Sequence, residues 1–432
     1  MQNNFESPIG RKAFDAVRSQ RPLAEKLFAA LIELSCDSEG GVTRAPYSPE
    51  ETNVHQRFGK IAQNLGLTVT RDALANTYMT LPGSDPAAKK ILIGSHLDSV
   101  KQGGNFDGAA GVVAGLVACA ALKELGIKPR CDISVMGVRA EESGWFGVSY
   151  VGSRGALGLL PDGALDARRS DTGMTLAEGI REAGGDPEAV AAREKTFNPE
   201  DLRCFLELHI EQGPLLDRDG LPVGIGTGIP GNFRFPDARV LGEYGHVGLL
   251  KAWRHDAVTA ASEFVVAMDA LWDEWEREGK PMACTIGKFS TDPGLHAMTK
   301  VPGELRFSLD VRTYSPEHLQ ELETKTLAII RSIEERRGVR FELGNTARAA
   351  VGEMAPEIRD GFEAIARELE IPYRLIGSPA SHDAAAFAAA GVPTAMIFVR
   401  NANGSHNPAE AMTIEDFLEA TAIMAAWLAK EV

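Results

Sequence analysis

Several kinds of feature are missing or scarce in this 432-residue sequence. No run of about 18 apolar residues occurs, so the sequence predicts no membrane-spanning helix. The opening residues, MQNNFESPIGRK, lack the basic-then-apolar order of a secretory leader. The five cysteines have no paired spacing, and Cys131 and Cys204 stand in apolar runs that predict buried, reduced thiols. We therefore expect a cytoplasmic protein with no membrane part and no disulfide framework.

Positive charge is also scarce. Lysine and arginine number 45 against 60 aspartates and glutamates, which leaves a formal net charge of −15. This balance argues against nucleic acid or an anionic membrane as the main partner. The 44% hydrophobic and 24% charged residues are ordinary for a globular protein, and the length favours two domains over one.

From about residue 90 the sequence alternates between short apolar runs and helical patterns. The run GAAGVVAGLVACAALKELG (108–126) predicts a helix rich in small residues. Short apolar runs between helices are typical of a mainly parallel sheet that is covered on both faces, which makes the fold class α/β. The predicted strands are KKILIGSH (89–96), CDISVMGVRAEE (131–142), LRCFLELHIEQG (202–213) and PTAMIFVR (393–400).

Residues 214–346 have a different pattern. Strand-like segments alternate with two long amphipathic helices, at 256–279 and 315–338, and Ser315 with Pro316 predicts the start of the second. The order βαββαβ predicts an α+β unit of ferredoxin-like type. We expect this unit to be inserted into a larger domain made of residues 1–213 and 347–432.

Chemically active side chains stand at or just beyond the predicted strand ends. In an open α/β sheet the carboxyl ends of the strands form the binding crevice, so residues far apart in sequence can converge there. Histidine nitrogens and carboxylate oxygens are ligands for zinc, manganese, cobalt and nickel ions. The candidate metal ligands are His96, Asp107, one of the adjacent pair Glu141 and Glu142, His209 and His406.

Each of these elements is weak evidence by itself. A Glu–Glu pair is usually a solvated surface, and a single histidine in a strand is more often structural. Polar, glycine-rich surroundings at the candidate positions favour a metal site. A single carboxylate could bridge two ions, and Asp98 could accept the ring N–H of His96 and select its tautomer. One member of the Glu pair could bind metal while the other acts as general base.

Several motifs, in this order, resemble those of the hydantoinase/carbamoylase amidase family. This family belongs with the aminoacylase-type dimetal peptidases and includes N-carbamoyl-L-amino-acid hydrolases, β-ureidopropionases and allantoate amidohydrolases. The resemblance runs from about residue 50 to the C-terminus and implies an aminopeptidase-like catalytic domain. Its motifs are GSHLDSVKQGGNFDG, AEESGWFGVSYVGS, ELHIEQGP, VPGELRFSLDVR, SHDAAAF, PTAMIFV and GSHNPAE.

The resemblance implies a centre of two divalent metal ions, zinc or manganese, with cobalt or nickel as alternatives. Asp107 would bridge the ions, next to a non-proline cis peptide bond, and Glu141 would be the general base. The remaining ligands would be His96, Glu142, His209 and His406.

The resemblance also implies how a small carboxylate substrate is held. Gln212 would lie near the substrate, His382 would line the pocket, and Arg312 would grip the carboxylate. His246 would reach the site of a partner subunit and stabilise the developing oxyanion. The inserted domain would act as a moving lid and as the interface of a homodimer.

The sequence departs from the family pattern in three places. HVGLLKAWRHDA replaces the usual Thr-Thr-Pro-Met run, and Thr299 stands where relatives commonly have asparagine. The loop RNANG also differs, and Asn401 or Asn403 could contact substrate. The metal chemistry is therefore better specified than the substrate.

The expected function is a metal-dependent amidohydrolase that cleaves a linear amide or ureido C–N bond. One alternative is an N-acyl-amino-acid amidohydrolase or dipeptidase of the same superfamily. Another is a non-catalytic binding relative, which the presence of every expected ligand and of the base disfavours.

Overall fold

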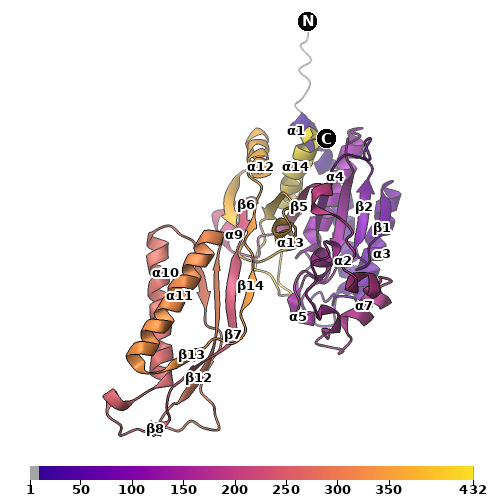
Figure 1. The fold of residues 1–432 in the computed structure, drawn as a ribbon. Coiled ribbons are helices and arrows are strands. Elements are labelled where there is room, and N and C mark those ends of the chain that lie inside the picture. The colour runs from indigo at the N-terminus through magenta and orange to yellow at the C-terminus, as the bar shows by residue number, and fades with distance from the viewer. Residues whose placement is uncertain (1–8, 432) are drawn as a thin grey trace. The chain divides into compact units, whose positions relative to one another are not determined.

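The computed structural model describes residues 9–431 and divides the chain into two compact units (Figure 1). The larger unit comprises residues 1–229 and 353–432, and the inserted unit comprises 230–352. The expected insert, 214–346, differs at both ends. Residues 215–229 form a short helix and a strand of the larger sheet, and strand β14 (Ala347–Ala349) pairs within the inserted unit. Residues 1–8, part of the segment on which the leader prediction rests, lie outside the described residues.

The larger unit is built on a nine-stranded sheet with the order β1-β2-β4-β3-β5-β17-β6-β15, and β16 pairs with β6. The four central neighbours β4, β3, β5 and β17 run parallel. The strands are β1 (Thr68–Arg71), β2 (Thr77–Leu81), β3 (Lys90–His96), β4 (Ile133–Val138), β5 (Leu202–Ile210), β6 (Val223–Ile229), β15 (Gly352–Glu353), β16 (Tyr373–Gly377) and β17 (Thr394–Val399).

Helices cover both faces of this sheet. One core joins the first face to α1 (Ile9–Ser19), α2 (Arg21–Ser35), α3 (Pro49–Asn64), α4 (Ala109–Glu124), α12 (Pro356–Glu368) and α14 (Ile414–Glu431). A second core joins the other face to α6 (Val151–Ala156), α9 (Leu215–Asp219) and α13 (Asp383–Ala389). A smaller cluster contains α5 (Ser143–Phe146), α7 (Leu176–Glu182) and α8 (Pro187–Ala191). Three short 3₁₀ helices are η1 (Ala164–Asp166), η2 (Pro199–Asp201) and η3 (Lys251–Trp253).

Helix α4 is apolar all round because it is buried all round. Every residue from Ala109 to Leu122 is buried. Gly111 lets the helix approach the sheet closely, since a Cβ there would lie 2.4 Å from the carbonyl oxygen of Leu208. This packing places the start of α4, and Asp107 just before it, against the carboxyl end of the sheet.

Alternation along the central strands decides which side chains face the same way. In β5, Cys204, Leu206 and Leu208 enter the first core, whereas Phe205 enters the second. Because side chains alternate across a strand, His209 shares the face of Phe205.

No helix among residues 9–431 has the length and apolarity needed to span a bilayer. All five cysteines are free, and Cys131 and Cys204 are buried as expected.

The inserted unit is an antiparallel sheet with two helices on one face. Its order is β10-β12-β7-β13, with β9 beside β12 and β14 beside β7, and β8 pairs with β11 in a separate ribbon. The strands are β7 (Gly231–Leu241), β8 (Gly245–His246), β9 (Ala283–Thr285), β10 (Phe289–Ser290), β11 (Lys300–Val301), β12 (Glu304–Thr313) and β13 (Arg340–Glu342). Helices α10 (Ala257–Arg277) and α11 (Pro316–Arg337) lie side by side (Figure 1). This arrangement confirms the expected α+β insert, and Ser315 caps α11.

The two faces of the inserted sheet differ in polarity. Phe233, Phe235, Phe307 and Val311 are buried in a core with Phe264 of α10. The other face carries charged side chains of β7 and β12, among them Arg234, Asp310 and Arg312. The polar face is therefore the one that is available to bind a polar ligand.

Candidate metal centre

The four central parallel strands bring the candidate ligands together at one edge of the larger sheet. His96 ends β3, and His209 is the next-to-last residue of β5. Glu141 and Glu142 follow β4 by a short turn, and His406 lies in the loop after β17. The structure therefore unites the ligand side chains that the strand-end argument selected.

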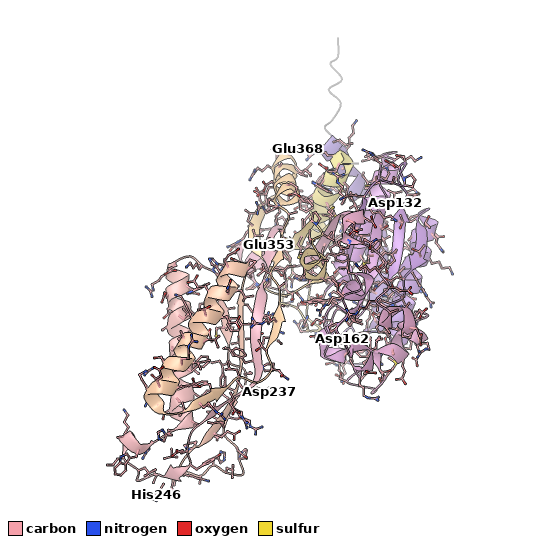
Figure 2. All side chains as sticks on the ribbon, viewed as in Figure 1. Asp132, Asp162, Asp237, His246, Glu353 and Glu368 are labelled. Atoms are coloured by element: carbon pink, nitrogen blue, oxygen red, sulfur yellow. The ribbon has the colours of Figure 1, made fainter. Side chains whose placement is uncertain are left out.

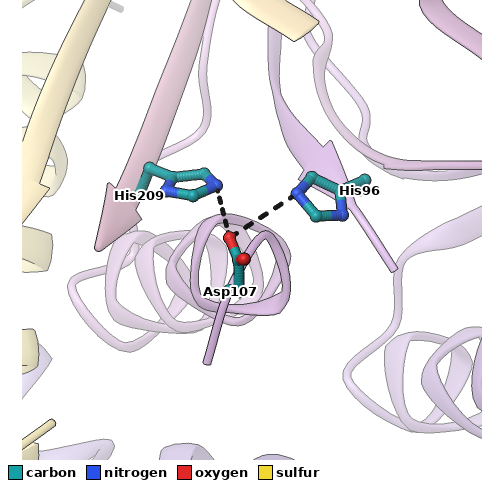
Figure 3. Close-up of side chains that lie close together, drawn as sticks. All are labelled: His96, Asp107 and His209. Carbon is teal, nitrogen blue, oxygen red and sulfur yellow. Dashed lines mark ion pairs between the residues drawn. The ribbon is translucent and has the colours of Figure 1, made fainter. Parts of the chain in front are cut away.

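Asp107 lies at the centre of this cluster (Figure 3). Its Oδ1 is 3.2 Å from Nε2 of His209 and 3.9 Å from Nε2 of His96. Its Oδ2 is 3.0 Å from Nε2 of His406, and that same nitrogen is 3.4 Å from Oε1 of Glu142. The two carboxylate oxygens of Asp107 thus face two different sets of donors.

The donor atoms form four overlapping groups that could each hold a cation. Glu207, His209 and His382 form one, His96, Glu141 and Glu142 form another, and the remaining two share Asp107. Of these two, His96, Asp107 and His209 form the first, and Asp107, Glu142 and His406 form the second. Within each group the donor atoms lie within 4.8 Å of one another. Imidazole nitrogen and carboxylate oxygen suit divalent zinc, manganese, cobalt and nickel ions, so the residues fit a metal centre.

Backbone carbonyls select the histidine tautomers. Nδ1 of His96 is 3.0 Å from the carbonyl oxygen of Asp98, and Nδ1 of His209 is 2.8 Å from that of Ile210. Because a carbonyl oxygen can only accept, Nδ1 carries the proton in each neutral ring. The lone pair is then on Nε2, the atom that faces Asp107.

Asp98 accepts the ring N–H of His96 through its main-chain carbonyl, and its carboxylate lies farther from the ring. Its Oδ1 is 3.7 Å from Nδ1 of His96, whereas the main-chain carbonyl of Asp98 is closer. The carboxylate instead accepts the backbone N–H groups of Glu141 and Glu142, each at 3.1 Å. The main chain of Asp98 therefore contacts His96 at the end of β3, and its side chain contacts the glutamates that follow β4.

Unusual backbone conformations occur at this edge of the sheet. Ala140, Gln212 and His406 have φ angles of 56°, 60° and 59°, a region that residues other than glycine seldom adopt. Gly108 has φ 67°, and a Cβ there would lie 2.4 Å from the His96 ring. Residues 9–431 contain no cis peptide bond, so the cis bond expected beside Asp107 is absent from this structure.

Burial and charge shift the pKa values of the cluster in opposite directions. Burial would raise the pKa of Asp107, but hydrogen bonds from His209 and His406 hold it well below its ordinary value. Burial lowers the pKa of His96 to about 4. For His209 burial also opposes the charged form, yet the hydrogen bond to Asp107 raises its pKa to about 9. A cation that binds at Nε2 of His209 therefore displaces a proton.

The two adjacent glutamates both have raised pKa values. Burial is the main cause that raises the pKa of Glu141 well above its ordinary value, and the charge of Glu142 is the second. Burial, followed by the charge of Asp107, raises that of Glu142 to about 8. Glu142 is the member near His406, whereas Glu141 belongs to neither group that shares Asp107. Glu141 shares a donor group with His96 and Glu142 only.

Three polar residues hold Asp107 in place, and sequence reasoning missed two of them. Gln212 donates from Nε2 to both carboxylate oxygens of Asp107, at 3.1 Å each. Ser405 Oγ lies 2.9 Å from Oδ2 of Asp107 and 2.7 Å from Oε2 of Glu410. Glu410 also accepts the backbone N–H groups of Phe106 and Asp107. Their signal was their place in the motif GSHNPAE, which holds His406.

Of the other expected substrate residues of the larger unit, two are buried and one is exposed. His382 is 2% exposed, its ring centroid is 4.3 Å from that of His209, and its Nε2 is 2.6 Å from Ser378 Oγ. It therefore packs against a candidate ligand. Asn401 is buried and accepts the backbone N–H of Gln212. Asn403 is exposed and donates to the carbonyl of Ala409 within its own loop.

His246, Thr299 and Arg312 belong to the inserted unit. His246 is exposed on β8, at the end of the unit (Figure 2), and pairs with Lys300 of β11. Thr299 is exposed, and its carbonyl accepts the N–H of Val247. Arg312 lies on the polar sheet face, where its Nε and Nη2 donate to the two carboxylate oxygens of Asp310 at 3.0 Å each.

A largely buried set of histidine and carboxylate donors at the carboxyl end of a mainly parallel sheet is the kind of site that metal-dependent hydrolases use. Residues 92–430 match the model of peptidase family M20/M25/M40, and the chain belongs to this family and, within it, to the hydantoinase/carbamoylase amidases. The chain is therefore a hydrolase that acts on C–N bonds.

Three relatives illustrate this membership. The chain is 34% identical over 400 residues to the N-carbamoyl-L-amino acid amidohydrolase of Geobacillus stearothermophilus, covering 91% of this chain and 94% of the relative. It is 30% identical over 415 residues to the allantoate amidohydrolase of Escherichia coli, covering 94% and 97%. It resembles the structure of a hydantoinase/carbamoylase family amidase from Burkholderia ambifaria with a TM-score of 0.80 and 25% identity, covering 95% and 96%.

Asp98→Asn tests whether the Asp98 carboxylate positions the glutamates. An amide offers one acceptor oxygen, so one of the two buried N–H groups would lose its partner. We expect metal affinity to fall by about 10–100-fold, as for other residues that orient ligands. The measurement is metal content after dialysis against a chelator. Asp132→Asn, just before β4, is the matched control and should retain metal; equal retention by Asp98→Asn would contradict the positioning role.

Proposed function

We propose that the chain hydrolyses a linear amide or ureido C–N bond of a small carboxylate substrate, such as an N-carbamoyl amino acid or allantoate. The observation that carries this proposal is the pair of donor groups that share Asp107, with the buried Glu141 beside them. The activities named for the relatives support the same bond type. We further propose one divalent ion, zinc or manganese, for each group, and a cytoplasmic location, which five free thiols support.

The chemistry divides between the metal centre and Glu141. Divalent ions at such a site polarise the scissile carbonyl and make water more acidic. Glu141 accepts a proton from the attacking water and delivers it to the leaving nitrogen. Gln212 and Ser405 keep Asp107 oriented throughout.

A substrate panel tests the proposal directly. The purified metal-loaded protein would be assayed with N-carbamoyl α-amino acids, N-carbamoyl-β-alanine and allantoate, and with N-acetyl amino acids and dipeptides. We expect ammonia release from the ureido acids. Because Thr299 and LLKAW replace the usual family residues, we expect N-carbamoyl-L-α-amino acids to be mediocre substrates. Turnover of N-acetyl amino acids or dipeptides alone would favour the acylase or peptidase alternative.

The polar face of the inserted sheet supports a role for Arg312 in binding the substrate carboxylate. Asp310 accepts from both Arg312 and Arg234, and Arg234 lies directly opposite it on β7. Two guanidinium groups around one carboxylate leave an excess of positive charge around Asp310. A planar guanidinium can bind a carboxylate with two parallel hydrogen bonds. We therefore propose that Arg312 grips the substrate carboxylate as the inserted unit closes as a lid.

Exposed apolar side chains support a homodimer through the inserted unit. Of the 13 large hydrophobic side chains exposed among the described residues, nine belong to residues 230–352. Leu250 and Trp253, at 64% and 67% exposure, lie close in sequence to His246. Concentrated apolar exposure is typical of an interaction surface. In the proposed dimer, His246 serves the site of the partner subunit.

Glu141→Gln should abolish most of the turnover while leaving fold and metal content intact. A positioned general base contributes about 10²–10⁴-fold to rate, and glutamine cannot transfer the proton. The measurement is kcat with the best panel substrate, alongside metal content per subunit. Loss of one metal with substantial activity after metal is restored would show that Glu141 is the ligand and Glu142 the base.

Arg312→Lys should raise KM by about tenfold or more, because an ammonium group cannot reproduce the two parallel hydrogen bonds. Metal content and thermal stability should not change. Arg306→Lys, on the same strand and paired with Glu304, is the matched control and should keep a normal KM. The proposed role of Arg312 is refuted if the unaltered protein hydrolyses a neutral amide as fast as its carboxylate analogue and Arg312→Ala does the same.

Mixing two inactive variants tests the dimer. His246→Ala and Glu141→Gln should each be nearly inactive, but a heterodimer of the two has one site with both groups intact. After dissociation and reassociation, an equal mixture should recover about a quarter of the normal activity, since half of the dimers carry one intact site. No recovery, although heterodimers are demonstrated, would show that His246 acts within its own subunit or not at all.

A further inference from the structure

A segment near the N-terminus lies along the loop that joins two of the candidate ligands. Val42 and Gly103 exchange two backbone hydrogen bonds of 2.9 Å, and Gln102 N–H donates to Oγ1 of Thr43 at 2.9 Å. Ser99 N–H donates to the carbonyl of Arg44 at 3.0 Å. Residues 42–44 thus accompany the chain between His96 and Asp107. They lie outside the region 92–430 that matches the family model.

The side chain of Arg44 strengthens this contact at the His96 end. Arg44 is fully buried, and its Nε donates to the carbonyl of Leu97 at 2.7 Å. Leu97 stands between the ligand His96 and Asp98. The backbone N–H of Arg44 donates to Oγ of Ser99 at 2.9 Å. Arg44 therefore holds both ends of the peptide segment from Leu97 to Ser99.

A second anchor fixes the guanidinium itself. Its Nη1 donates to Oγ of Ser35, at the end of α2, at 3.1 Å. The guanidinium therefore connects α2 to the turn after β3. A lysine has a single nitrogen and cannot span both acceptors in the same planar geometry.

The burial of this charge is costly, which argues against an incidental packing role. A buried charge destabilises the folded state unless it is paired or fully hydrogen-bonded, and Nη2 of Arg44 has no hydrogen-bond partner among the described residues. Burial lowers the pKa of Arg44 to about 10, while the charges of Asp98, Glu410 and Asp107 oppose this shift. Arg44 therefore remains charged at neutral pH, next to an acidic cluster that its charge partly balances.

The consequences of moving Leu97 extend beyond His96. The main-chain carbonyl of Asp98 orients the His96 ring, and the Asp98 carboxylate accepts the N–H groups of Glu141 and Glu142. Trp145, in α5 beyond the glutamates, donates its indole N–H to the carbonyl of Ser99 at 2.8 Å. The segment held by Arg44 is thus the one on which the β3 and β4 contributions to the metal centre depend.

We propose that Arg44 is a positioning residue of the metal centre, which holds the Leu97–Ser99 turn so that His96 and Asp98 are correctly placed for metal binding. This role rests on the metal centre and does not depend on which substrate is hydrolysed.

The test compares metal affinity in three variants of the full-length protein, with Zn²⁺ as the probe in competition with a chromophoric chelator. Arg44→Met should bind Zn²⁺ about 10–100-fold more weakly, the usual effect of losing a residue that orients a ligand. Arg44→Lys should recover part of this loss, because it keeps the charge and one donor. The matched control is Arg169→Met, which removes another buried arginine that donates to the carbonyl of Pro46 at 2.9 Å; it should lower thermal stability and leave Zn²⁺ affinity unchanged.

Zn²⁺ affinity of Arg44→Met equal to that of the unaltered protein would overturn the proposal. An equal loss in Arg169→Met would do the same, since the effect would then be one of general destabilisation. If Arg44→Met does not fold, Ser35→Ala replaces it, because this change removes the anchor of Nη1 at a distance from the ligands. Ser35→Ala should weaken Zn²⁺ binding severalfold, and unchanged affinity in this variant would also refute the positioning role.

Discussion

The carboxylate of Asp107 is the group on which the rest of the candidate site depends. It is buried, yet its pKa is held well below the ordinary value, because the imidazoles of His209 and His406 stabilise its charge against burial. Gln212 and Ser405 contribute further contacts to its oxygens. These partners come from the end of β5 and from the loop after β17. They therefore meet only when these strands have paired in the sheet. A charge shared in this way suits a site that holds two cations.

Close packing around Asp107 explains the small residues and the unusual backbone nearby. Gly111 lets α4 approach the sheet, and Gly108 turns the chain with a positive φ while leaving space for the His96 ring. Ala140 and His406 adopt left-handed conformations without being glycine, which costs of order 1 kcal/mol each. Ala140 directly precedes Glu141, and His406 is itself a candidate ligand. Hydrogen bonds fix the neighbouring residues, since Asp98 accepts the N–H of Glu141 and Glu410 accepts from Ser405 Oγ.

The strand-end residues could be predicted because apolar runs mark the central strands and parallel strands end at a common edge. The positions of His96 and His209 followed from this argument alone. The contacts of Glu410 and Arg44, and those of the Asp98 carboxylate with the two glutamate N–H groups, could not be predicted in the same way. Each residue acts through hydrogen bonds to main-chain groups distant in sequence, and no local pattern encodes which carbonyl or N–H will be nearby. The insert boundary was misplaced for a similar reason, since β6 joins the larger sheet only by pairing with β16 and β17.

By itself, the sequence determined the α/β class, the existence of an α+β insert and the chemical types of the metal donors, because periodicity and residue type are local properties. The tertiary structure decided how those donors are grouped. It placed Glu142 near His406, left Glu141 outside the two groups that share Asp107, and assigned the ring N–H of His96 to a carbonyl instead of a carboxylate. These choices depend on distances of a few ångströms between segments far apart in the chain, which only the packing of α4 and its neighbours against the sheet defines.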